Sequence, residues 1–370
     1  MKNKLSIITA TILLGSSALE ASSFDLADAL ESGTLGGDIG IYGEYQDKKE
    51  EKDARFSMGS LGLTYESAKF HNFGLSLGFR ANGKIEEKED GDYDNENAPS
   101  VLLHSANISY EVEFGSLAVG RQELDLEWAT DFHEAIVGVF TPLTDLTITA
   151  GHSRKVGEAS EDEPLVKFDK FNGNDGAQFL DVAYSGVNNM LLKAYAYNAN
   201  DIATWYGAKV EWDSEVLGFT LHGAKSDEKE DKKGAEHNGH IYHIEARGAY
   251  ADFALNGGYV TTSKNGGIGS METMGESINP LDEGDKVYEH DARTYYIGLG
   301  YEFGDLSLGV LCGNTKYKDD DMKKREKEIN FSADYTFSEN LTIGALVTKI
   351  DAHENENDYT KFALSATYSF

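Results

Sequence analysis

The chain has 370 residues, and its 64 acidic against 33 basic side chains give a formal net charge of −31, which argues against a nucleic-acid partner because phosphate binding draws on clustered Lys and Arg. Its single cysteine cannot form an internal disulfide, and beyond Leu5 to Leu14 no stretch stays apolar for the roughly 18 residues of a membrane-spanning helix. Aromatic residues at 11%, together with 39 glycines, favour strands joined by tight turns over a disordered chain.

The first 21 residues have the three-part layout of a secretory signal peptide. Two lysines come before the apolar stretch from Leu5 to Leu14, and the small residues Gly15 to Ala18 follow it. The alternative, a buried first helix, fits less well because the apolar stretch is short and has basic residues only in front of it. Residues 22–35 are then expected to form a short periplasmic segment with one helical turn that ends at Gly33.

From residue 36 to residue 370, apolar and polar side chains alternate in segments of about ten residues, the length that a tilted strand needs to cross a membrane. A period of two fits these segments, and the helical period of 3.6 does not. Three of the clearest apolar faces are Phe73, Leu75, Leu77 and Phe79; Tyr295, Ile297, Leu299 and Tyr301; and Phe362, Leu364, Ala366, Tyr368 and Phe370.

Short and long connections take turns between these segments, and the long ones are strongly charged, as in 84–99, 155–176 and 264–291. The count is about eighteen strands, an even number with all short turns on one side. We therefore expect an all-β fold, a transmembrane antiparallel β-barrel over 36–370 with short periplasmic turns and long extracellular loops. A soluble sandwich or propeller also alternates, but it does not need strands of membrane-crossing length or Tyr and Phe near the strand ends.

Four stretches resemble the outer-membrane porins of the OprD type, found in ε-proteobacteria (the Opr family porins) and in pseudomonads: "LADALESGTLGGDIGIYGEY", "LGLTYESAKFHNFGLSLGFR", "SYEVEFGSLAVGRQELD" and the terminal "ALSATYSF". The resemblance implies a diffusion pore in an eighteen-stranded barrel. It also implies that the third loop, around Asp125, Glu127 and Asp131, folds into the lumen as a constriction, and that Phe370 is the signal read by the outer-membrane assembly machinery. The chain departs from the family in one respect, because it shows no plain ladder of basic residues for the lumen.

If the apolar faces contact lipid, the polar face of each strand lines the pore, and its charges set the selectivity. Alternation places eight charged residues in the lumen, namely Arg80, Lys209, Arg247, Glu44, Glu111, Glu211, Glu245 and Glu302. Lys193 points inward only if Leu192 and Ala194 face lipid. Arg121 shares the face of Leu117 and Val119, so that a lumenal position requires a bulge or a strand end; the resemblance places it at the constriction.

Each of these charged residues has an alternative role as a solvated or ion-paired wall residue with no effect on transport. A lumen of mixed sign below acidic loops predicts weak selectivity, with a mouth that enriches cations at low salt.

The sequence thus predicts a porin in the outer membrane of a Gram-negative bacterium, through which ions and small polar solutes, organic acids among them, diffuse passively. The expected partners are the lipid bilayer with its lipopolysaccharide, the assembly machinery and the solutes; a homotrimer stays open. No cofactor and no metal site is predicted. An enzyme is not expected, because the candidate pair His104 and Ser105 should point to opposite faces of one strand. The alternative function is a non-transporting adhesive or structural surface barrel.

Overall fold

The computed structural model describes residues 25–370 apart from 94–97, 230–236, 285, 320–321 and 355–356, so the predicted signal peptide lies outside the described residues. The first element is the short helix α1 (Leu26–Glu31), whose N-cap residue Asp25 accepts a hydrogen bond from the backbone N–H of Ala27 at 2.7 Å. A backbone bond from Ala68 to Ala29, 3.0 Å long, ties α1 to the first short turn of the barrel. Within the described residues, no helix is both long and apolar enough to cross a bilayer.

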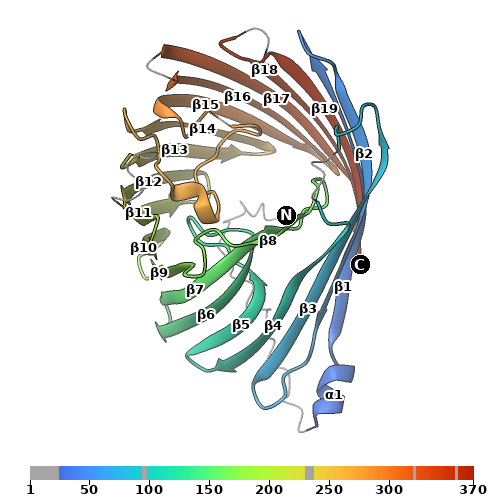
Figure 1. The fold of residues 1–370 in the computed structure, drawn as a ribbon, viewed down its shortest axis with the longest axis vertical. Helices are drawn as coiled ribbons and strands as arrows, with labels where there is room; N and C mark the ends of the chain where they lie inside the picture. Colours follow the sequence, from blue (N-terminus) through green and yellow to red (C-terminus); the bar gives the residue numbers. More distant parts are fainter. Residues whose placement is uncertain (1–24, 94–97, 230–236, 285, 320–321, 355–356) are drawn as a thin grey trace.

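Nineteen strands follow within the described residues, and they form one antiparallel sheet that closes on itself (Figure 1). Their bounds are β1 (Thr34–Lys48), β2 (Ala54–Glu66), β3 (Phe73–Glu87), β4 (Val101–Val112), β5 (Gly115–Glu123), β6 (Phe132–Leu143), β7 (Leu146–Glu158), β8 (Val166–Asp169), β9 (Ala177–Tyr184), β10 (Met190–Ala199), β11 (Ala203–Asp213), β12 (Leu217–Glu228), β13 (His240–Tyr250), β14 (Phe253–Thr262), β15 (His290–Phe303), β16 (Leu306–Asp319), β17 (Met322–Ser338), β18 (Leu341–Asp351) and β19 (Tyr359–Ser369).

Each strand pairs with its neighbours in chain order, and β19 pairs with β1 to close the barrel. The exception is β8, which has four residues and pairs with β7, while β7 and β9 also pair directly with each other. The wall therefore consists of eighteen strands, and the prediction of about eighteen is confirmed. β1 begins at Thr34, two residues before the predicted start of the barrel.

The apolar face of each strand points out of the barrel. Ile39 and Ile41 are more than half exposed, whereas Gly40 between them is buried on the inner side. Aromatic rings pair at the strand ends next to the short turns, as in Phe73–Tyr110, Phe114–Phe140, Trp212–Phe219, Phe253–Tyr301 and Tyr368–Phe370. An apolar outer band with an aromatic girdle is typical of a barrel that sits in a membrane.

The largest apolar cluster lies inside the barrel, against one side of the wall. Two long connections, 124–131 and 263–289, supply Trp128, Met271 and Met274 to it, and the second of them contains the short helix η2 (Met271–Met274). The wall supplies inward side chains from β9 to β15, among them Phe179, Tyr197, Trp205, Ile241, Val260 and Tyr296. The side chains packed here therefore fill the lumen on this side, where Figure 1 shows the connection 263–289 in orange inside the barrel.

Candidate functional site

The connection 124–131 is fastened to the inner wall by one buried carboxylate. Glu127 is 3% exposed, and its oxygens lie 2.6 Å from Nζ of Lys193 and 3.1 Å from Nζ of Lys209. Ser277, from the connection 263–289, donates a further hydrogen bond to Glu127 at 2.8 Å. Burial alone would raise the pKa of the Glu127 carboxyl, but the two ammonium groups and the ring of His222 lower it to about 2.

Aromatic contacts hold the same connection from its other side. Nε1 of Trp128 donates to the hydroxyl of Tyr195 at 2.9 Å, and that hydroxyl is 2.8 Å from Nε2 of His222. All three side chains are buried. Because Tyr195 and His222 belong to the wall strands β10 and β12, the connection is fixed against the wall and cannot move without breaking buried hydrogen bonds.

Two carboxylates of the wall strands bind the connection 263–289 through hydrogen bonds. Glu228 accepts hydrogen bonds from the backbone N–H of Ser270 and from its hydroxyl, each 2.9 Å long. Glu328 accepts from three successive backbone N–H groups, those of Asp282, Glu283 and Gly284, at 2.8 to 3.2 Å. This connection was expected to be an extracellular loop, and its inward fold was missed. The apolar residues Met271, Met274, Ile278, Leu281 and Val287 within a charged stretch were the available signal.

A third connection, which we call the hairpin tip (residues 159–165), crosses the lumen toward β1 and β3 (Figure 1). The side-chain amide of Asn82 donates to the backbone carbonyls of Ser160 at 2.9 Å and Glu163 at 2.7 Å. Leu165, at the base of the tip, is 1% exposed. The hairpin tip is therefore attached to the wall opposite the strand from which it starts.

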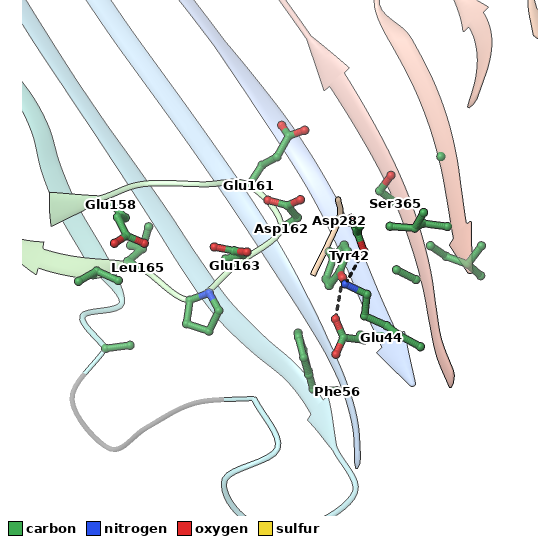
Figure 2. A pocket seen from close by; sticks show the side chains of 18 of the residues that line it. Tyr42, Glu44, Phe56, Glu158, Glu161, Asp162, Glu163, Leu165, Asp282 and Ser365 are labelled. Carbon is green, nitrogen blue, oxygen red and sulfur yellow. Dashed lines mark hydrogen bonds and ion pairs between the residues drawn. The ribbon is translucent and has the colours of Figure 1, made fainter. Parts of the chain in front are cut away.

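A cavity of about 1100 Å³ lies between the hairpin tip and the wall formed by β1, β2 and β17 to β19. We call it the acid-lined cavity, since eight carboxylates line it, those of Glu44, Glu158, Glu161, Asp162, Glu163, Asp169, Asp282 and Asp334, against the two lysines Lys167 and Lys361. Figure 2 shows Glu161, Asp162 and Glu163 on the hairpin side and Tyr42, Glu44 and Asp282 on the opposite side.

The wall of the acid-lined cavity is open because its inward residues are small. Gly344 on β18 pairs with Ser365 on β19, and Ser332 on β17 lies two residues from Asp334, the partner of Gly344 on its other side. A Cβ at Gly344 would lie 2.6 Å from Oγ of Ser365, so that even alanine would crowd this wall. The small residues of the wall and the position of the hairpin tip thus both leave this space open.

The predicted pore-lining cations are held in ion pairs. The guanidinium of Arg80 makes two hydrogen bonds to the carboxylate of Asp38, at 2.7 and 2.8 Å. Arg247 bonds Asp213 at 3.0 Å and Glu245 at 2.7 Å. The two lysines at Glu127 were described above, and Lys209 also lies 3.1 Å from Glu211. Glu111, on β4, pairs with Lys69 in the first short turn.

Arg121 has a different environment. The pairing of β5 with β4 runs without a shift from Val119 to Arg121, so that alternation keeps Arg121 on the face of the half-exposed Val119. Its guanidinium donates to the carbonyl of Leu103 at 2.8 Å and lies 4.3 Å from the ring centre of Phe168. Its position at the constriction stays a prediction.

The three acidic residues predicted for the constriction differ in their surroundings. Glu127 holds the connection 124–131 to the wall through its ion pairs, whereas Asp125 is exposed. Asp131 lies at the end of the connection with a φ of 67°, and its carbonyl accepts the backbone N–H of Leu124 at 2.8 Å. Alternation alone could not single out Glu127, because its partners are distant in sequence.

The expectation for His104 and Ser105 was wrong. A register shift in the pairing of β3 and β4 brings both side chains to the same side, with 3.0 Å between Nδ1 of His104 and Oγ of Ser105. Both residues are buried, at 7% and 8% exposure.

The closed barrel, its lipid-facing band and its lumenal connections define the class of outer-membrane channels. The family profile described as Gram-negative porin matches residues 9–370 of the chain, and the chain belongs to this family. It is therefore a Gram-negative outer-membrane porin, a channel through which ions and small hydrophilic solutes diffuse, and the predictions of a porin, of its fold, of its location and of transport are confirmed.

Solved structures share this fold at low sequence identity. OccK8 (OprE) of Pseudomonas aeruginosa is 13% identical with a TM-score of 0.75, over 92% of this chain and 98% of that one. OccAB1 of Acinetobacter baumannii is 14% identical with a TM-score of 0.77, over 95% and 99%. OpdK of Pseudomonas aeruginosa, crystallised with vanillate, is 15% identical with a TM-score of 0.75, over 92% and 99%. No curated protein sequence matches the chain.

Proposed function

We propose that this porin passes ions and small hydrophilic solutes, small organic acids among them, without transforming them. The observation that carries the proposal is the acid-lined cavity, an open space inside a closed barrel in which the connections 124–131 and 263–289 are packed against the wall. Organic acids are candidate solutes because OpdK, which has the same fold, was crystallised with the carboxylate vanillate.

Planar-bilayer recording with the purified full chain tests this function. We expect discrete conductance steps in KCl, and we expect liposomes that contain the protein to swell in small sugars and in vanillate. A protein that inserts into bilayers but does not conduct would refute the function and favour a surface or adhesive barrel. Release of a modified product from any solute would refute the absence of enzymatic activity.

The roles of the predicted pore residues belong to the same proposal. Glu127 supports a constriction by the third loop, because its ion pairs keep that loop inside the barrel. The inward cations Arg80, Lys193, Lys209 and Arg247 are proposed to line the channel as neutralised pairs with Glu211, Glu245 and other carboxylates.

Phe370 is proposed as the assembly signal. Its backbone exchanges hydrogen bonds of 2.9 and 3.0 Å with Gly37, which closes the barrel at the end where α1 lies, and its ring is half exposed. Deletion of Phe370 should lower the amount of folded barrel in the outer membrane, and an unchanged amount would contradict the proposal. The mass of the detergent-purified barrel decides between a single chain and a homotrimer.

A further inference from the structure

We propose that the permeation path of this porin runs through the acid-lined cavity and that the carboxylates of the hairpin tip make the channel prefer cations to anions. The preferred solutes are then alkali cations and small organic ammonium compounds. This inference rests on the proposed function, since it states which solutes a conducting pore prefers and which residues cause that preference.

The first step is that one side of the lumen is filled by packed side chains. The connections 124–131 and 263–289 pack Trp128, Met271 and Met274 against β9 to β15, and these three side chains are fully buried. Carboxylates hold both connections there, Glu127 for the first and Glu228 and Glu328 for the second. The acid-lined cavity lies on the side of β1 and β17 to β19, away from this cluster.

The second step is the sign of the charge around that space. Its eight carboxylates exceed its two lysines by six, and both lysines are already paired. Nζ of Lys361 lies 3.1 Å from Asp282 and also contacts Glu283, and Nζ of Lys167 lies 3.7 Å from Asp169. A narrow space with low-dielectric walls focuses the field of its excess charges, so that cations concentrate in it and anions are repelled.

The third step concerns the hairpin tip itself. Glu161, Asp162 and Glu163 face Glu44 and Asp282 across the cavity (Figure 2). Burial and the neighbouring carboxylates, Asp38 beside Glu161 and Asp162 beside both, raise the pKa of Glu161 and Glu163, although Arg80 and Lys361 oppose the shift. These carboxylates thus lie in a negative electrostatic environment, and a passing cation lowers the repulsion among them.

The cavity also has an aromatic wall that suits organic cations. The rings of Tyr42 and Phe56 lie 5.9 Å apart between their centres, and both line the cavity. An ammonium group passing between hairpin and wall can contact a ring face and a carboxylate in turn. A carboxylate solute of the same size gains neither contact.

The test is the reversal potential of single channels in a KCl gradient. The wild-type channel should favour K⁺, and the triple variant Glu161→Gln, Asp162→Asn, Glu163→Gln should lower the K⁺/Cl⁻ permeability ratio by about threefold or more. The matched control is Glu50→Gln, Glu51→Gln, Glu89→Gln, which removes three exposed carboxylates from connections outside the cavity. That control should keep a ratio close to wild type.

A preference for Cl⁻ in the wild type, or a triple variant with the wild-type ratio, would overturn the inference while leaving a conducting porin. Absence of any conductance would overturn both the inference and the proposed function. If the triple variant fails to insert, Asp334→Asn on the wall of β17 serves instead, since it removes one cavity carboxylate and leaves the hairpin intact. This variant should also lower the K⁺/Cl⁻ permeability ratio, and an unchanged ratio would count against a permeation path through the acid-lined cavity.

Discussion

Replacement of Glu127 by Gln should free the connection 124–131 from the inner wall. The change leaves the ammonium groups of Lys193 and Lys209 near a neutral amide inside the barrel. Loss of one partner of a buried ion pair costs about 3–5 kcal/mol. The pKa of Glu127, lowered from its ordinary 4.5 to about 2, gives a similar figure of about 3 kcal/mol for the docked loop.

The sign of this effect follows from the lowered pKa. A carboxylate whose pKa is depressed in the docked state stabilises docking above pH 4.5, and this stabilisation disappears as the pH falls toward 2. At neutral pH the full contribution is present in the wild type and absent in Glu127→Gln. A difference of about 3 kcal/mol is more than a hundredfold in the docking equilibrium, so that undocked states become visible in single-channel records.

Single-channel recording at neutral pH measures the outcome. Glu127→Gln should show larger or rapidly fluctuating conductance, and Asp125→Asn, an exposed carboxylate of the same connection, should behave as wild type. The double variant Glu127→Gln, Lys193→Met should recover part of the loss, because it removes one of the two ammonium groups next to the amide, while Lys209 keeps its ion pair with Glu211. A Glu127→Gln channel with wild-type conductance and noise would refute the role of Glu127 in holding the connection 124–131 to the wall.

Three further predictions concern other charges of the lumen. As the pH is lowered, the K⁺/Cl⁻ permeability ratio should begin to fall above the usual titration range of glutamate, because Glu161 and Glu163 have raised pKa values and take up protons early; a ratio that is constant down to pH 4 would contradict this. Asp38→Asn should leave Arg80 unpaired in the lumen, reduce the same ratio, and lower the free energy of unfolding by about 2 kcal/mol in urea titrations. Glu328→Gln should loosen the segment that it holds, by about 3 kcal/mol, and limited proteolysis of the connection 263–289 should become faster.

The wall of this barrel could be predicted from the sequence, because alternation is a local property. The side chains of Phe73 and Leu77 face outward wherever their strand lies, since successive residues of a strand point to opposite faces. The alternation of short and long connections fixed the strand number in the same way. No partner across the barrel needs to be known for either inference.

The filled lumen could not be predicted in this way. Glu127 and Lys193 are 66 residues apart, and their contact depends on how far a loop turns inward and on which strand it then meets. Asn82 and Glu163 are 81 residues apart, and a charged hairpin tip looks like a solvated loop until its backbone carbonyls are seen on an asparagine of the opposite wall. The contact of His104 with Ser105 depended on a bulge, which interrupts the alternation that the prediction assumed.

The net charge of −31 does not by itself decide the selectivity of this porin, because position determines which carboxylates a passing ion feels. Carboxylates on exposed connections are screened over about 8 Å at physiological salt and over about 3 Å at 1 M. Those of the acid-lined cavity lie within a narrow space between hairpin tip and wall, so that an ion passes close to them at any salt concentration. If the cation preference persists at 1 M KCl, its source is therefore the cavity. If the preference disappears at 1 M KCl, its source is the charged mouth of the channel.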